Sequence, residues 1–269
     1  MLTRANLSHM VSAKATTAWS EWREMSQTFV LIVGAWHGGW AWHSVAAELR
    51  AAGHDVHAPT LPGLGENDDP STLTLEQCVD FVAEYITGND LTDVVLVGHS
   101  WGGFVVSGVT KRLGSSAIAR RVYYSAFVPL TGEGLVDIVP PDYAGMFGQL
   151  AEASGNNSVA MPLPVFQGAF MQDASEEAQR IVHAALVPQP YGYFTDSLDL
   201  DGLEDLGVPA SYVISPDDVA LPPGEFAWAP RFPSRLKDPL IVNTIGSHES
   251  LFTQPEAVAK ALQEAAPAI

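Results

Sequence analysis

The chain has 269 residues, 47% of them hydrophobic and 16% charged, a composition that excludes intrinsic disorder and predicts a packed protein with a sizeable core. Its formal net charge of −18, from 31 acidic and 13 basic side chains, disfavours binding to nucleic acid or to an anionic membrane surface. Cys78 is the only cysteine, which excludes an intrachain disulfide and a multi-cysteine metal site, and we expect it in the core.

The first 26 residues differ in pattern from the rest of the chain. They contain charged side chains and no long apolar run, which argues against a secretory signal. No stretch of the sequence approaches the roughly 20 apolar residues needed to cross a bilayer. We therefore predict a flexible extension over residues 1–26, one domain over residues 27–269, and a cytoplasmic location.

Strands and helices are predicted to alternate from about residue 28. The run Val94–Val97 is continuously apolar, as expected for a parallel strand covered on both faces. The expected strands cover residues 29–33, 55–58, 94–97 and 122–128, and the expected helices cover residues 40–52, 75–86 and 101–113. This alternation implies right-handed crossovers and a doubly wound, mostly parallel sheet of the α/β class.

The alternation lapses from about residue 129 to residue 201. Helical pieces are expected near residues 143–153 and 175–185, and an insertion of this length predicts a functional cap over a site. Aromatic and methionine side chains in this segment fit either a hydrophobic substrate group or the cap's own core: Met146, Phe147, Met161, Phe166, Phe170, Met171, Tyr191, Tyr193 and Phe194. Strands then resume at residues 210–214 and 240–245, and a helix over residues 255–265 closes the chain.

The segment Gly98-His99-Ser100-Trp101-Gly102 carries the clearest chemical signal. It is a G-x-S-x-G sequence between an apolar strand and a helix, which is the context of a nucleophile elbow. Glycines at 98 and 102 allow the strand and helix backbones to close around a sharp turn. The amides at the start of the helix face the place where negative charge would develop. Ser100 is therefore predicted to be a nucleophile.

A serine hydroxyl needs a base and an orienting acid, expected in the chain order Ser, Asp, His. Asp217 and Asp218 directly follow the strand predicted at 210–214, and His248 follows the strand predicted at 240–245. Ligand sites of open parallel sheets lie at the carboxyl ends of their strands. His248 is thus the predicted base, and spacing alone leaves both aspartates open as the acid.

Five segments together resemble one known family. They are the loop Val33–Trp40, the loop Leu61–Gly65, the elbow, the Asp217-Asp218 turn and Ser247-His248-Glu249. From about residue 28 the chain resembles the α/β-hydrolase superfamily, in the capped branch of plant methylesterases, hydroxynitrile lyases and bacterial carboxylesterases.

The resemblance assigns further roles. It implies an oxyanion hole formed by the backbone amides of Ala35 and Trp101, although Val33 stands where the family commonly has histidine. In the family the acid commonly lies four residues before a proline, and Pro222 favours Asp218 in that register.

These observations predict a serine carboxylic ester hydrolase that cleaves a small or medium hydrophobic ester through an acyl-enzyme, with no metal or organic cofactor. The expected partner is a small-molecule substrate, and the oligomeric state stays open. The alternatives are a C–C lyase or hydrolase on the same scaffold, or a small-ligand receptor with weak turnover. The related lyases carry lysine after the catalytic histidine and threonine in the first oxyanion loop, where this chain has Glu249 and Gly34. Ester hydrolysis is therefore favoured.

Overall fold

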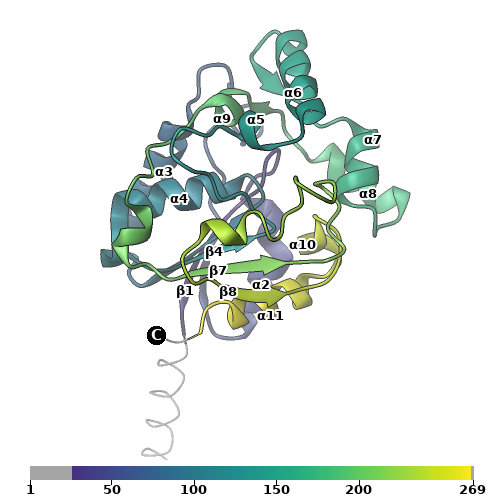
Figure 1. Ribbon diagram of the computed structural model, residues 1–269. Coiled ribbons are helices and arrows are strands. Elements are labelled where there is room, and N and C mark those ends of the chain that lie inside the picture. The colour runs from purple at the N-terminus through teal and green to yellow at the C-terminus, as the bar shows by residue number, and fades with distance from the viewer. Residues whose placement is uncertain (1–25, 268–269) are drawn as a thin grey trace, which may run out of the picture.

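A six-stranded parallel sheet forms the centre of the computed structural model, which describes residues 26–267 (Figure 1). The strand order is β2-β1-β3-β4-β7-β8, and every neighbouring pair is parallel. The strands are β1 (Thr28–Ile32), β2 (Asp55–His57), β3 (Val94–His99), β4 (Ile118–Tyr124), β7 (Ala210–Ile214) and β8 (Leu240–Asn243). The predicted doubly wound α/β fold class is confirmed.

Helices cover both faces of this sheet. The pair α3 (Leu75–Gly88) and α4 (Gly102–Leu113) packs together, and so does the pair α2 (His43–Ala51) and α11 (Pro255–Glu264). Cys78 is buried on α3, as predicted. The predicted helix over residues 40–52 divides into a 3₁₀ turn, η1 (Gly39–Trp42), followed by α2. The other predicted helices begin and end within about two residues of the observed ones, the usual scatter at helix ends.

The strand predicted over residues 122–128 is displaced in the structure, where β4 ends at Tyr124. The first half of β4 contains Arg120 and Arg121, and the buried Arg121 guanidinium is paired with Glu204 at 2.7 Å. Ser125 then takes a φ of +40°, which ends the strand. The apolar residues beyond it form a loop, in which the Phe127 amide donates to the Ser100 carbonyl at 3.1 Å.

Short elements fill the long segment between β4 and β7. They are α5 (Leu135–Ile138), α6 (Pro141–Ser154), β5 (Ser158–Val159), α7 (Leu163–Val165), η3 (Phe166–Phe170), α8 (Glu176–Ala184), β6 (Gln189–Pro190), α9 (Gly192–Thr195) and η4 (Leu203–Leu206). Figure 1 shows α5, α6 and α9 above the sheet, and α7 and α8 on the side toward which β7 points. This placement brings the segment over the carboxyl end of the sheet.

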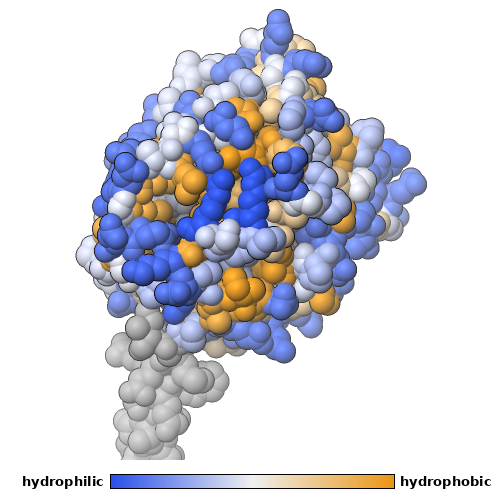
Figure 2. All heavy atoms as spheres, in the orientation of Figure 1, coloured by the Kyte–Doolittle hydropathy of each residue, from blue (hydrophilic) through white to orange (hydrophobic). Residues whose placement is uncertain are grey.

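The edge strand β8 is more exposed than the central strands. Leu240, Ile241 and Ile245 are exposed, and Figure 2 shows an apolar patch where Figure 1 places β8. The strand was predicted to continue to residue 245, but Gly246 takes a φ of +92° and the chain turns after Asn243. Of the predicted extension over residues 1–26, all but Ser26 lies outside the described residues. Within residues 26–267 no helix has the length and apolar character to span a bilayer.

One close approach of backbone segments gives a stability prediction. A Cβ on Gly103, in α4, would lie 1.9 Å from the Phe127 carbonyl oxygen. Gly103→Ala is therefore expected to lower the free energy of unfolding by more than about 3 kcal/mol, measured by urea denaturation. Gly145→Ala is the control, because Gly145 is exposed in α6 with no atom near its Cβ position, and alanine there should stabilise by about 0.5–1 kcal/mol. Equal effects of the two substitutions would contradict this reading.

Candidate active site

Ser100 occupies the sharp turn between β3 and α4. Its φ of +53° lies in the left-handed region that non-glycine residues rarely adopt. Backbone hydrogen bonds hold this conformation, since the Ser100 amide donates to the Tyr124 carbonyl at 3.2 Å and the Ser100 carbonyl accepts from Gly103. A Cβ on Gly98 would lie 2.7 Å from the Gly102 carbonyl oxygen, and a Cβ on Gly102 would lie 2.6 Å from that of Val33. Glycine at both positions therefore leaves the room that the turn needs.

The loops after β7 and β8 bring a carboxylate and an imidazole together. His248 Nδ1 donates to Asp218 Oδ2 at 2.8 Å, and both side chains are buried. The other Asp218 oxygen accepts from the Ala220 amide at 3.0 Å. Asp217 is exposed and accepts instead from the Gly246 amide. Of the two adjacent aspartates, the geometry places Asp218 against the imidazole.

The His248 imidazole is enclosed by aromatic rings and by backbone contacts. Trp228 stacks on it with ring centroids 5.3 Å apart and an interplanar angle of 9°, and Phe170 meets it edge-on at 5.2 Å. His99 Nε2 donates to the His248 carbonyl at 3.0 Å, so His99 supports the loop that carries His248. These contacts fix the ring plane, and the Asp218 contact fixes which nitrogen faces the cavity.

Opposing effects set the proton affinity of His248. Burial lowers its pKa, whereas the charge and hydrogen bond of Asp218, together with the charge of Glu249, raise it. The net result is a pKa above the ordinary value of 6.5.

Ser100, His248, Ala35 and Trp101 line one small cavity. Its volume of about 30 Å³ leaves room for no more than about two water molecules. The remaining lining is apolar or aromatic: Trp36, Phe127, Leu135, Val139, Tyr143, Phe147, Phe170, Ala220, Leu221 and Trp228. The predicted oxyanion donors thus lie beside the serine.

Both alternatives for the aromatic and methionine side chains of the 129–201 segment hold in part. Phe147 and Phe170 line the cavity, whereas Phe166 and Phe194 are buried without lining it. Trp228 was missed by sequence reasoning. It lies in the irregular loop after Asp218, which has no periodicity that could have placed it near the base.

Hydrogen bonds hold the loop that carries Ala35 from the far side. Trp36 takes a φ of +68°, and its amide donates to the Gln189 side-chain oxygen at 2.8 Å. Its indole Nε1 donates to the Val159 carbonyl, also at 2.8 Å. Strands β5 and β6 therefore fix the position of this loop, although Val33 replaces the histidine common in the resembled family.

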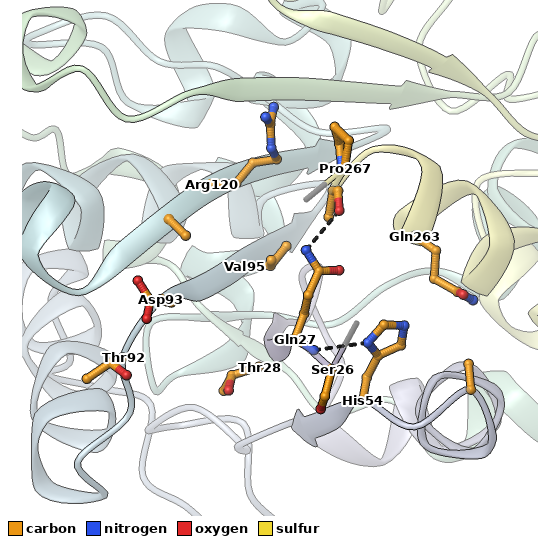
Figure 3. Close-up of a pocket in the computed structure, with 13 residues that line it drawn as sticks. Ser26, Gln27, Thr28, His54, Thr92, Asp93, Val95, Arg120, Gln263 and Pro267 are labelled. Atoms are coloured by element: carbon orange, nitrogen blue, oxygen red, sulfur yellow. Dashed lines mark hydrogen bonds between the residues drawn. The ribbon is translucent and has the colours of Figure 1, made fainter. Parts of the chain in front are cut away.

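A larger hollow of about 690 Å³ lies at the opposite, amino end of the strands (Figure 3). Gln27 crosses it, with its amide donating to His54 Nδ1 at 3.2 Å and its side chain donating to the Ala266 carbonyl at 2.8 Å. The hollow is bordered by Ser26 and Pro267, the first and last described residues. Gln27 joins the start of β1 to the end of α11 there, and ligand sites of open parallel sheets lie at the opposite, carboxyl ends of the strands, so we assign the proposed chemistry to the smaller cavity.

Comparison with known proteins matches the chain to alpha/beta hydrolases both in sequence and in structure. The model of the alpha/beta hydrolase family matches residues 29–261. A solved structure described as an extracellular alpha/beta-hydrolase from a Paenibacillus species, with structural and functional homology to tobacco salicylic acid binding protein 2, is 33% identical. It superposes with a TM-score of 0.86 over 90% of this chain and 99% of that one.

Curated relatives include esterases. A carbendazim hydrolyzing esterase of Nocardioides sp. (strain SG-4G) is 46% identical over 114 residues, which are 42% of this chain and 47% of that protein. The match therefore spans about half the length of this relative. Methylesterase 2 of Arabidopsis thaliana is 26% identical over 250 residues, 86% of this chain and 92% of that protein. The family match over residues 29–261, with the observed fold, shows that the chain belongs to the alpha/beta hydrolase family.

Proposed function

We propose that this protein is a serine carboxylic ester hydrolase in which Ser100, His248 and Asp218 act as a catalytic triad. The observation that carries the proposal is the buried 2.8 Å contact between His248 and Asp218, with the imidazole lining the same cavity as the strained Ser100. The esterases among the relatives support the same class of reaction.

The geometry suits acyl transfer through an acyl-enzyme. Ser100 attacks the ester carbonyl, and His248 takes the serine proton at Nε2 because Nδ1 already donates to Asp218. The amides of Ala35 and Trp101 stabilise the oxyanion, each contributing about 3–4 kcal/mol. His248 then protonates the leaving alcohol, and water releases the acid by the reverse sequence. These steps need no metal or organic cofactor.

The cavity lining indicates a hydrophobic ester of small or medium size. Aromatic and aliphatic side chains surround Ser100 and offer few polar contacts to a substrate. Because the cavity of about 30 Å³ is narrow around Ser100, we infer that lining side chains move when an ester enters. Tyr143 and Phe147 lie on α6, so we propose that residues 129–201 act as the cap that moves. The cytoplasmic location stays a prediction.

The substrate class is tested by turnover of p-nitrophenyl, methyl and aryl esters of increasing acyl length. We expect cleavage that falls as the acyl group lengthens, because the cavity walls are closely packed around Ser100. A serine-directed fluorophosphonate should label the wild type and leave Ser100→Ala unlabelled. A protein that binds esters without cleaving them and resists the label would be a receptor.

Cyanohydrin cleavage is the reaction of the hydroxynitrile lyases in the resembled branch, and two residues disfavour it in this chain. Glu249 is 2% exposed and lies next to His248, so a buried carboxylate stands where the related lyases have lysine. A Cβ on Gly34 would lie 2.9 Å from His99 Nδ1, which leaves no room for their threonine. We expect no benzaldehyde release from mandelonitrile above the uncatalysed rate. Release that is lost in Ser100→Ala, without cleavage of a phenylacetate ester, would reverse this assignment.

The pH dependence of ester turnover follows from His248. Only the neutral imidazole accepts the serine proton, and the pKa of His248 is raised above 6.5, so activity should be low in acid and increase with pH. We expect kcat/KM, measured from about pH 5 to about pH 9, to inflect above pH 6.5. An inflection below that value would mean that burial outweighs the Asp218 contact in the working enzyme.

A further inference from the structure

A second buried acid–imidazole pair lies beside the proposed triad. His37 Nε2 and Glu249 Oε2 face each other at 3.6 Å, and their side chains are only 3% and 2% exposed. Neither atom has a hydrogen-bond partner elsewhere among the described residues. Trp40 and Phe252 pack against the His37 ring, each with its centroid 5.8 Å away. Among residues 26–267, the polar contact of these two atoms is therefore the one with each other, and at 3.6 Å it is longer than a hydrogen bond.

Whether these two facing atoms attract or repel each other depends on where their hydrogens lie. His37 Nδ1 lies 2.7 Å from the Ala35 carbonyl oxygen, and because a carbonyl only accepts, Nδ1 carries a hydrogen. The facing contact is then attractive when the hydrogen is on either Nε2 or Oε2, and repulsive when both are bare. A buried polar pair without hydrogen bonds lowers the stability of the fold more than an apolar pair of the same shape. A polar pair at this place therefore indicates a role other than packing.

The pair joins the two loops that the proposed reaction uses. On one side, His37 binds the carbonyl of Ala35, the residue whose amide is the proposed oxyanion donor. On the other side, Glu249 follows His248 directly, and its amide donates to the Phe170 carbonyl at 3.0 Å. The pair therefore connects the loop of the proposed oxyanion donor to the loop of the proposed base.

We propose that His37 and Glu249 form a positioning pair that keeps the loop carrying Ala35 in its place relative to His248. The inference rests on the proposed esterase function. Neither side chain lines the cavity, so the pair acts through Ala35 and His248 and touches no substrate. Loss of the contact should weaken stabilisation of the tetrahedral intermediate and leave ground-state ester binding nearly unchanged.

The test is a double-mutant cycle with His37→Phe, Glu249→Met and the double variant. Both changes replace the facing polar atoms by apolar groups of similar shape, and His37→Phe also removes the Nδ1 hydrogen bond to the Ala35 carbonyl, so it should be the worse single variant. We expect each single variant to lose about 10- to 100-fold in kcat, with KM within about threefold of the wild type. The double variant should lose no more than the worse single one, because the second change removes a contact already lost. Inhibition by a trifluoromethyl ketone, which mimics the oxyanion, should weaken in proportion to kcat/KM.

Conservative and distant substitutions separate positioning from folding. Glu249→Gln places an amide group, which can donate, opposite His37 Nε2, so its kcat should recover to within about fivefold of the wild type. Glu256→Met, at an exposed site on α11, is the matched control and should behave as the wild type. If Glu249→Met does not fold, the kcat and KM of His37→Phe test the positioning role alone, since the phenyl ring retains the packing against Trp40 and Phe252.

The outcomes are distinguishable. Unchanged kcat in folded single variants, additive losses in the double variant, or a rise in KM with kcat intact would each overturn the positioning role. A wild type without ester turnover would instead remove the proposed function, and the inference with it.

Discussion

Ser100→Ala is expected to lower kcat for ester hydrolysis by at least about 10³-fold while leaving the fold intact. The loss is large because the residues of a triad act as a unit, and a base without a nucleophile leaves only attack by water. The fold should survive because alanine keeps the Cβ in the tight turn, and the hydrogen bonds there are made by the Ser100 backbone. Steady-state kinetics with a p-nitrophenyl ester and a thermal melt measure the two parts.

The control for this substitution is Ser116→Ala, at an exposed serine in the turn after α4. It should retain wild-type kcat and thermal stability. If purified Ser100→Ala kept more than about a tenth of wild-type turnover, Ser100 would not be the nucleophile.

Asp218→Asn is expected to lower kcat by up to about 10⁴-fold, the loss that the same change causes in a serine protease triad. The Asp218 carboxylate accepts from His248 Nδ1 and stabilises the charged imidazolium that forms during attack. An asparagine at this place offers either an uncharged oxygen or an amide donor that favours the wrong tautomer. The measurement is kcat with the same ester, alongside circular dichroism to confirm folding.

The adjacent carboxylate provides a matched control. Asp217 has the same side chain one residue away but is exposed and contacts the Gly246 amide, so Asp217→Asn should stay within about threefold of wild-type kcat. The converse pattern, with Asp217→Asn inactive and Asp218→Asn active, would move the acid to the neighbouring residue.

The parts of the molecule that the sequence predicts well are those with a local signal. The apolar run Val94–Val97 predicts a central strand, and the glycines on either side of Ser100 predict a sharp turn. Both signals lie within ten residues of each other in the sequence. His248 was placed because a strand precedes it, and the carboxyl ends of parallel strands converge. Local patterns therefore suffice for the fold class and for the edge of the sheet where His248 and Asp218 meet.

Features that depend on contacts between residues far apart in the sequence could not be predicted. The start of β4 was missed because the charge of Arg121 is neutralised by Glu204, 83 positions away. Trp228 stacks on His248 from an irregular loop, and the buried Glu249 faces His37, which lies on another loop. In each case burial of a polar or bulky residue depends on a contact that only the folded chain creates.

The order of strands in the sheet also bears on when the proposed esterase activity appears during folding. The strand before Ser100, the proposed nucleophile, lies at the centre of the sheet. His248, the proposed base, follows β8, the last strand to be synthesised and the outermost on its side. His99 and His248, in contact in the native state, are 149 positions apart. Contacts of such long range form late, after helices and local turns. During refolding, return of ester cleavage should therefore lag behind recovery of the helical circular dichroism signal and mark completion of the sheet.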